Sequence, residues 1–331
     1  MTPLAASATA FQYEGRLDRA NPSQPVLIWA GSRVRVDFEG PVLAVVFGTA
    51  TGQSYFDLTV DGVTEVVAGS AGRYVCPHGL GTGRHRLELL KRSEADAGQV
   101  AFHGVELAAG AQAWAPEPRA YRFRMEFIGD SITAGANNED GAVDQWEDRR
   151  THNHALSYGY LTSQAFGADH RAMAVSGMGL CEGFVPMVAG EAWDKVYPRD
   201  NPRRADLSVW VPEVVCVNLG ENDAAFTQAN GRPFPAGFTT AYVALIKAVR
   251  AAYPAAHIVL LRGGMAGGAT NPELRAAWAA AVGELEAADP AISHFVFQHW
   301  TEQHPRVRDH RVMAAELTAW LKAQGWMGPH I

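Results

Sequence analysis

The first third of the chain alternates between apolar and polar residues, which is the pattern of half-buried β-strands. Residues 33–38 place three apolar side chains against three charged ones, and residues 55–67 repeat this alternation on either side of a turn. Residues 85–92 and 100–107 indicate further strands, whereas helical periodicity is nearly absent before residue 112. Many short strands joined by glycine-rich turns predict a β-sandwich or jelly roll.

The pattern changes after residues 111–120, which carry the proline content of a linker. Continuous apolar runs, typical of strands buried on both faces, now alternate with segments of helical period. This alternation predicts a parallel sheet with helices on both faces. We therefore expect a β-sandwich domain at residues 1–112, a linker at 113–121 and an α/β domain at 122–331. The expected strands are residues 121–129, 170–177, 213–220, 257–264 and 294–300, and the expected helices are 155–167, 239–254, 271–289 and 308–325.

Chemically active residues follow several of the expected parallel strands. The first strand ends in Gly-Asp-Ser, with the serine at Ser131, and the second is followed by a glycine-rich turn that contains Gly177. The third strand leads into Asn222, and His304 follows the last strand, directly before a proline. Because the carboxyl ends of parallel strands share one edge of the sheet, we expect these four residues to lie together.

This set of residues matches the requirements of acyl transfer. A serine hydroxyl needs an adjacent base, for which histidine is the usual choice, and the oxyanion that forms needs fixed donors. We expect Ser131 to attack and His304 to take its proton. The backbone N–H groups of Ser131 and Gly177 and the side-chain amide of Asn222 would hold the oxyanion. Gly-Asp-Ser alone is also ordinary turn chemistry, so the argument depends on the whole set.

Four short blocks carry a resemblance to a known superfamily. "GDSIT", "VSGMG", "LGEND" and a late "HP", in this order and each after an expected strand, resemble the blocks of the SGNH, or GDSL, hydrolases. Residues 13–40, followed by a β domain, are similar to the family two carbohydrate esterases. The resemblance implies a jelly roll joined to a flavodoxin-like SGNH domain. It also implies a cofactor-free serine esterase that removes acetyl groups from the sugars of plant polysaccharides.

The sequence departs from the superfamily pattern at one position. The aspartate that usually precedes the histidine by three residues is replaced by Thr301, and the nearest carboxylate is Glu302. A carboxylate normally orients the histidine and stabilises its charged form. Three alternatives stay open: Glu302 substitutes, a backbone carbonyl supports the histidine in a Ser-His dyad, or the base is poorly supported.

Three further residues are candidates for contact with the substrate. Phe226 and Trp300 lie near the expected edge and would stack on a sugar ring, although an aromatic residue more commonly packs in a core. Met178 follows Gly177 and would line an acyl pocket. We expect no metal site, since the histidines of "THNH" have no third ligand and the three cysteines have no CxxC spacing.

Composition narrows the classes of partner. The net charge is -7 and no cluster of basic residues is present, which argues against nucleic acid. No apolar run approaches the ~20 residues of a membrane span, so we expect no membrane association. The start of the chain lacks the features of a signal peptide, whereas the family resemblance implies export; localisation stays open.

Three functions therefore compete. The first is a carbohydrate deacetylase, with 6-O-acetylated hexosides among its candidate substrates. The second is an esterase of the same superfamily that acts on lipids or short-chain acyl esters. The third is a glycan-binding protein whose catalytic domain has degenerated, and the altered position at Thr301 is the only feature that favours it.

Overall fold

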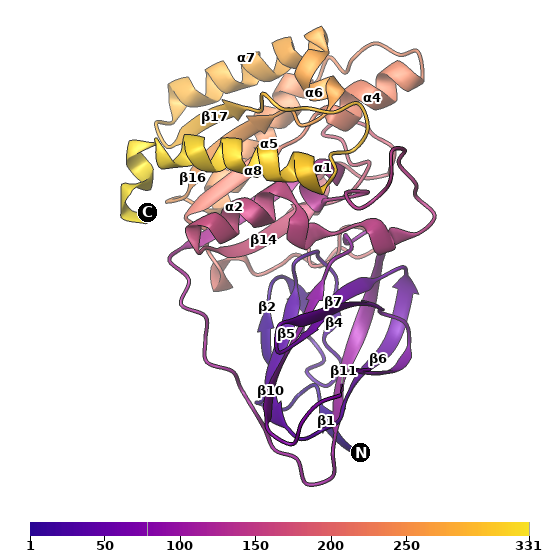
Figure 1. Cartoon of the computed structure of the whole chain (residues 1–331). Helices are drawn as coiled ribbons and strands as arrows, with labels where there is room; N and C mark the ends of the chain where they lie inside the picture. The colour runs from indigo at the N-terminus through magenta and orange to yellow at the C-terminus, as the bar shows by residue number, and fades with distance from the viewer. Residues whose placement is uncertain (78, 331) are drawn as a thin grey trace. The chain divides into compact units, whose positions relative to one another are not determined.

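The chain folds into two compact units, shown in Figure 1. The computed structural model describes residues 1–77 and 79–330. The first unit contains Met1–Ala120 together with the short segment Glu147–Arg150, and the second contains Tyr121–Trp146 and the chain from Thr151 onward. One loop of the second unit thus gives four residues to the first.

The first unit is a sandwich of two antiparallel sheets, as the alternating pattern predicts. One sheet has the order β3-β4-β11-β6-β9, with β1 paired to β11, and the other has the order β12-β5-β10-β7-β8, with β2 paired to β5. Strand β12 lies inside the segment expected to be a linker and pairs with β5. The first sheet consists of β1 (Thr2–Ala5), β3 (Leu17–Asp18), β4 (Val26–Leu27), β6 (Leu43–Gly52), β9 (Gly72–Val75) and β11 (Gly98–Leu107). The second consists of β2 (Gln12–Glu14), β5 (Arg33–Glu39), β7 (Tyr55–Val60), β8 (Val63–Ala68), β10 (Arg84–Lys91) and β12 (Ala113–Trp114).

Alternate residues of β5 divide between two environments. The apolar set contributes to the core between the sheets, where Val34 and Phe38 are fully buried. The polar set is buried as well, since Arg33 and Arg35 are only 4% and 2% exposed. Both guanidinium groups form ion pairs with Glu14. The outer face of this strand is therefore covered by paired charges.

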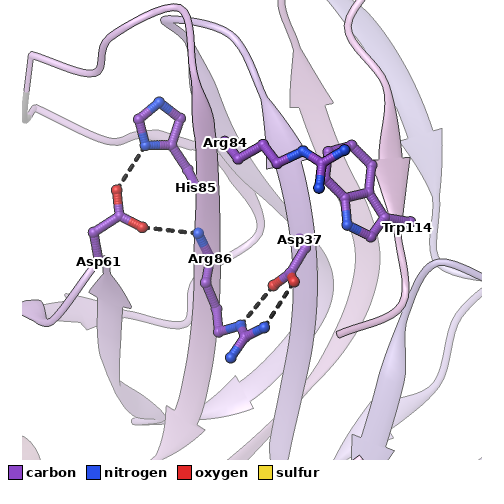
Figure 2. Close-up of a pocket in the computed structure, with 6 residues that line it drawn as sticks. All are labelled: Asp37, Asp61, Arg84, His85, Arg86 and Trp114. Atoms are coloured by element: carbon purple, nitrogen blue, oxygen red, sulfur yellow. Dashed lines mark hydrogen bonds and ion pairs between the residues drawn. The ribbon is translucent and has the colours of Figure 1, made fainter. Parts of the chain in front are cut away.

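A pocket of about 260 Å³ in the first unit is lined by Asp37, Asp61, Arg84, His85, Arg86 and Trp114, which Figure 2 shows. Its charged side chains pair with one another. The Arg86 guanidinium donates to both carboxylate oxygens of Asp37, at 2.6 and 2.7 Å, and His85 Nδ1 lies 2.6 Å from a carboxylate oxygen of Asp61. Arg84 stacks on the indole of Trp114 at 4.6 Å. These pairs join β5, β10, β12 and the turn after β7.

The second unit is built on a five-stranded parallel sheet of order β14-β13-β15-β16-β17. This is the flavodoxin-like order, in which the chain reverses direction on either side of the first strand. The predicted α/β class is confirmed. The carboxyl ends of β13, β14 and β15 thus meet at the topological switch point, where such sheets place their sites. The strands are β13 (Arg124–Gly129), β14 (Asp169–Ala174), β15 (Val214–Asn218), β16 (His257–Arg262) and β17 (Ile292–Val296).

Helices cover the sheet, with α2 and α8 in front of the strands in the view of Figure 1. These two helices pack on the side chains of β13, β15 and β16 that point to one face, and they form one apolar core with them. Helices α5 and α7 pack against each other. Among the described residues, no helix combines the length and apolar character needed to cross a membrane. The α-helices are α1 (Ser131–Ala134), α2 (Tyr158–Phe166), α3 (Ala189–Ala192), α4 (Glu221–Ala229), α5 (Phe238–Ala252), α6 (Ala266–Thr270), α7 (Pro272–Ala288) and α8 (Val307–Lys322).

The junction of α2 and α8 contains a fully buried histidine. His310 Nδ1 accepts a hydrogen bond from the backbone N–H of Tyr158 at 3.2 Å. Burial lowers the pKa of His310 to about 3; Asp309 opposes this shift, and His304 and His154 add to it. The folded state therefore holds this imidazole neutral over most of the acid range.

We predict that His310 makes the second unit sensitive to acid. Below about pH 6.5 the unfolded chain takes up a proton at this histidine that the folded state does not, so stability is lost as the pH falls toward 3. Replacement by Asn keeps an acceptor and cannot titrate. Urea unfolding should show H310N less stable than wild type at pH 7. The difference in the free energy of unfolding between wild type and H310N should narrow by up to about 1.4 kcal/mol per pH unit below pH 6. A difference that stays constant with pH would contradict a lowered pKa for His310.

Candidate active site

Ser131 stands at the end of β13, as the first residue of α1. The preceding residues explain this placement. A side chain at Gly129 would collide with Thr133 and would approach the carbonyl of Asn218 to 2.9 Å. Asp130 caps α1, accepting a hydrogen bond from the backbone N–H of Ile132 at 3.1 Å. Gly-Asp-Ser therefore turns a buried strand sharply into a helix and leaves the serine at the edge of the sheet.

His304 lies directly beside the serine. Its Nε2 is 2.8 Å from Ser131 Oγ, although the two residues are 173 positions apart in the sequence. Ser131 is 3% exposed, so the pair sits in a site that already excludes most water. A serine hydroxyl within hydrogen-bond reach of an imidazole is the geometry of an activated nucleophile. The structure thus brings together the two residues that the sequence pattern put forward for this role.

The other nitrogen of His304 is held by a carboxylate that the sequence analysis did not name. Nδ1 lies 2.6 Å from Asp144 Oδ2, and the backbone N–H of His304 donates to the same oxygen at 3.1 Å. The Arg306 guanidinium donates to Asp144 Oδ1 at 2.7 Å. Burial acts to raise the pKa of Asp144, but the hydrogen bonds from His304 and Arg306 outweigh it and hold that pKa well below its usual range. Asp144 therefore stays a carboxylate.

The structure replaces all three sequence-based alternatives for the support of His304. Glu302 is exposed and does not take the Nδ1 position, which Asp144 occupies. The hydroxyl of Thr301 donates to the carbonyl of Gln303 at 2.6 Å. The expectation that Glu302 or a backbone carbonyl orients the histidine is thus wrong in this structure, because Asp144, from a loop distant in sequence, is the hydrogen-bond partner of His304 Nδ1.

Sequence reasoning missed Asp144 for a physical reason. The residue lies in a loop between α1 and α2 that contains five carboxylates within ten positions, and nothing in their local spacing distinguishes one from another. The selecting contact is Arg306, two residues after the histidine, which also donates to the carbonyls of Asn137 and Gly141 in that loop. The sequence offered one signal that pointed to a carboxylate partner, namely the cationic side chain of Arg306 two residues after His304.

Besides the N–H of Ser131, the two other predicted oxyanion donors are Gly177 and Asn222, which follow β14 and β15. Gly177 follows β14 with φ +77°, a conformation that suits glycine, and a Cβ there would be 3.1 Å from Cβ of Phe184. Asn222 is in the first turn of α4, and its Nδ2 lies 3.2 Å from Asp130 Oδ2 and 3.1 Å from the carbonyl of Met178. Asn222 is therefore tied to the residue next to Ser131.

Asp130 carries an unusual charge state. Burial, followed by the nearby charge of Glu221, raises the pKa of Asp130 to about 8. The carboxyl is therefore largely neutral near pH 7. A neutral carboxyl is a weaker acceptor than a carboxylate, so the hydrogen bond that the Asn222 amide donates to Asp130 is correspondingly weaker.

The predicted substrate contacts have different surroundings. Met178 is 1% exposed and lies within the protein. The ring of Phe226 meets that of Phe184 edge-on, with centroids 5.3 Å apart, and Phe184 is 56% exposed. Trp300, 39% exposed, lies on the segment between β17 and His304. Phe184 was not named by the sequence analysis; it follows Gly177 closely and donates its N–H to the carbonyl of that glycine at 2.8 Å.

The histidines of "THNH" have structural partners. His154 Nε2 lies 2.9 Å from His170 Nε2, and His152 packs edge-on against Trp146. Within residues 1–77 and 79–330, no group of three histidine, cysteine or acidic side chains is placed to hold a metal ion.

Two family models match the chain, one for each unit. The model described as "Carbohydrate esterase 2 N-terminal" matches residues 13–118, and the model "GDSL-like Lipase/Acylhydrolase family" matches residues 127–314. The second match covers more than half of the chain and includes Ser131, Gly177, Asn222 and His304.

Curated and solved relatives agree with these matches. The cellulase/esterase CelE of Acetivibrio thermocellus is 32% identical over 95% of this chain, and the chain spans 39% of the length of that protein. An acetylxylan esterase / glucomannan deacetylase of Cellvibrio japonicus is 25% identical, over 89% of this chain and 84% of its own. Among solved structures, a family two carbohydrate esterase from Clostridium thermocellum, in complex with cellohexaose, has a TM-score of 0.83 and 31% identity. That match covers 94% of this chain and 98% of the other.

We predict that Asp144, and not Glu302, supports the reactivity of Ser131. In D144N the imidazole loses the carboxylate that fixes its tautomer and stabilises its charged form. The rate of inactivation by a fluorophosphonate, which reacts with activated serines, should fall by roughly 10³- to 10⁴-fold. E302Q is the matched control and should react as wild type does. If E302Q were inactivated slowly and D144N at the wild-type rate, Glu302 and not Asp144 would be the supporting carboxylate.

Proposed function

The chain belongs to the GDSL-like lipase/acylhydrolase family and, within it, to the family two carbohydrate esterases, and we propose that it removes O-acetyl groups from plant polysaccharides through an acyl-enzyme. The observation that carries this proposal is the continuous hydrogen-bonded line from Ser131 through His304 to Asp144, at the carboxyl ends of the parallel strands. Ester hydrolysis by this line needs water as its only other reactant.

The first half of the reaction forms the acyl-enzyme. Ser131 Oγ attacks the carbonyl carbon of the acetyl group while His304 Nε2 takes the hydroxyl proton, and Asp144 stabilises the imidazolium. The negative oxygen of the tetrahedral intermediate accepts hydrogen bonds from the N–H groups of Ser131 and Gly177 and from the Asn222 amide. The intermediate then collapses, His304 returns the proton to the departing sugar oxygen, and the deacetylated sugar leaves.

The second half repeats these steps with water. His304 Nε2 accepts a proton from a water molecule, whose oxygen attacks the acetyl-serine carbonyl. The same donors hold the second oxyanion. Collapse breaks the bond to Ser131 Oγ, which recovers the proton from His304, and acetic acid is released as acetate. In each half of the reaction His304 first accepts a proton as a base and then returns it as an acid.

Acetylated sugar is the substrate class that has most support. The N-terminal unit matches the carbohydrate esterase model, and a similar protein from Cellvibrio japonicus is named as an acetylxylan esterase / glucomannan deacetylase. Ser131 and His304 are both present and paired, which argues against a degenerate catalytic domain. An esterase for lipids or longer acyl chains is the remaining alternative. The preferred acyl-chain length of the substrate distinguishes it from a carbohydrate deacetylase.

The aromatic pair of the exposed Phe184 and the half-buried Phe226 is our candidate for contact with the sugar. The two rings meet edge-on, and Phe226 belongs to α4, the helix whose first turn contains Asn222. Aromatic faces provide apolar area without requiring a specific set of hydroxyls. We propose that this pair, together with Trp300, holds the polysaccharide, while Met178 packs behind the acetyl group.

The proposed reaction predicts loss of acetate release in S131A. Wild type should release acetate from acetylated xylan, glucomannan or a 6-O-acetylated hexoside, and S131A should be slower by at least ~10³-fold because the nucleophile is gone. In parallel, 4-nitrophenyl acetate should be hydrolysed faster than the butyrate and octanoate. Preference for octanoate would favour the lipid alternative, and inactivity on all substrates by a folded protein would contradict an esterase.

The aromatic proposal predicts a substrate-dependent effect on KM. F184A and W300A should each raise KM for acetylated polysaccharide by about 3- to 10-fold, the range expected for one aromatic contact. KM for 4-nitrophenyl acetate should not change, since that ester carries no sugar. Exposed Val209 offers a matched surface control as V209A. Equal increases in KM for both substrates would indicate that these rings support the local structure and do not contact the sugar.

A further inference from the structure

The segment that follows Gly177 is an irregular loop folded around a carboxylate. Asp223, in the first turn of α4, accepts a hydrogen bond from the backbone N–H of Leu180 at Oδ2, at 2.8 Å. Its Oδ1 accepts from the N–H groups of Cys181 and Glu182, at 2.7 and 3.2 Å. Three successive backbone N–H groups thus converge on one side chain, as they do on a bound anion in a backbone nest.

Asp223 is fully enclosed by the protein, with a side chain that is 0% exposed. Burial raises the pKa of Asp223, and the three N–H donors oppose that rise because they stabilise the charged form. Both carboxylate oxygens act as acceptors here, whereas an asparagine at this position would offer only one. The shape of the loop therefore depends on an aspartate and not only on a side chain of this size.

The loop closes on itself beside Gly177. The backbone N–H of Phe184 donates to the carbonyl of Gly177 at 2.8 Å. A Cβ at Gly183 would collide with that same carbonyl, and a Cβ at Gly179 would collide with the carbonyl of Glu182. Backbone thus packs directly on backbone, so a shift of the residues that Asp223 holds also shifts Gly177.

The residue before Asp223 binds the same turn from its other end. Asn222 Nδ2 donates to the carbonyl of Met178 at 3.1 Å, two residues before the first N–H that Asp223 accepts. Because Asn222 and Asp223 are adjacent in one helical turn, they contact the loop from a single rigid base. The first turn of α4 therefore fixes where Gly177 lies relative to the Asn222 amide.

We propose that Asp223 is a positioning residue for the oxyanion donors, which acts by holding the turn that carries the Gly177 N–H at a fixed place beside the Asn222 amide. This inference rests on the proposed function, in which these two groups stabilise the negative oxygen. It gives a part in the reaction to a carboxylate that does not touch the substrate.

The chemistry of Gly177 explains why such support is needed. Its φ of +77° is a conformation that glycine adopts readily, and glycine is also the residue with the greatest backbone freedom. A backbone N–H has no side chain of its own to hold it in place. Donors stabilise a developing oxyanion best when they are fixed before the charge appears, so a misplaced N–H lowers kcat more than it weakens substrate binding.

The first test compares D223N with wild type on 4-nitrophenyl acetate. The amide keeps the shape of the side chain but turns one acceptor oxygen into a donor that faces a backbone N–H. The kcat should fall by about 10- to 10²-fold, somewhat less than when an oxyanion donor is removed outright, and KM should not change. D206N is the matched control, because Asp206 also accepts a backbone N–H, that of Ser208 at 3.0 Å, in a loop of the same unit. It should behave as wild type does.

A transition-state analogue separates positioning from a general loss of structure. Ser131 Oγ adds to the carbonyl carbon of a trifluoromethyl ketone while His304 takes the hydroxyl proton, and the former carbonyl oxygen becomes an anion that the oxyanion donors bind. The Ki of this ketone should rise in D223N by the same factor by which kcat/KM falls. A partly unfolded variant would lose kcat in proportion to the active protein that remains, with the Ki of wild type.

A second variant covers the case in which D223N fails to fold. G183A leaves Asp223 intact but displaces the carbonyl of Gly177, so it should also lower kcat, leave KM unchanged and raise the Ki of the ketone. Hydrogen exchange should be slow at the Leu180 and Cys181 amides of wild type and faster in D223N. Thermal unfolding checks that each variant is folded. An unchanged kcat in G183A would show that this turn does not set the donors, and would overturn the inference.

The remaining outcomes distinguish this inference from the function beneath it. Wild-type kcat and Ki in a folded D223N would overturn the inference and leave the proposed mechanism intact. A lower kcat with an unchanged Ki would make Asp223 merely structural. If wild type itself neither cleaves acetyl esters nor binds the ketone, the proposed function fails, and the inference fails with it.

Discussion

The hydrogen bond between His304 Nδ1 and Asp144 is the interaction on which the site depends. It fixes the tautomer of the imidazole, so that Nε2 faces Ser131 Oγ as an acceptor, and it stabilises the charge that develops when the proton moves. Burial acts to raise the pKa of Asp144, but the hydrogen bonds from His304 and Arg306 hold it well below its usual range and so favour the carboxylate form.

That dependence makes one irregular loop critical. The sheet places Ser131, Gly177 and Asn222 without help, because each follows a parallel strand whose register is fixed by its neighbours. Asp144 has no such support. It is held instead by single side chains: the Arg306 guanidinium donates to its Oδ1 at 2.7 Å, and its own backbone N–H donates to Gln303 Oε1 at 3.2 Å.

The candidate oxyanion side of the site is shaped by burial. Asp130 caps α1, and Glu221 and Asn222 lie in the first turn of α4; burial, followed by the nearby charge of Glu221, raises the pKa of Asp130 to about 8. The amide beside it therefore faces a largely neutral partner near pH 7. Asp223 serves the same region structurally, since its carboxylate accepts the backbone N–H groups of Leu180, Cys181 and Glu182 after Gly177.

The sequence by itself determined the β-sandwich, the parallel sheet and the Ser131–His304 pair, because strand period and strand order depend on local pattern and on general rules of connection. Gly177 and Asn222 followed from the same rule about strand ends. Only the tertiary structure decided which carboxylate supports the histidine. Glu302 is close in sequence but faces solvent, whereas Asp144, 160 residues away, meets the imidazole. Selecting one acid from five in a loop without periodicity requires the contact with Arg306, which leaves no periodic signal in the chain.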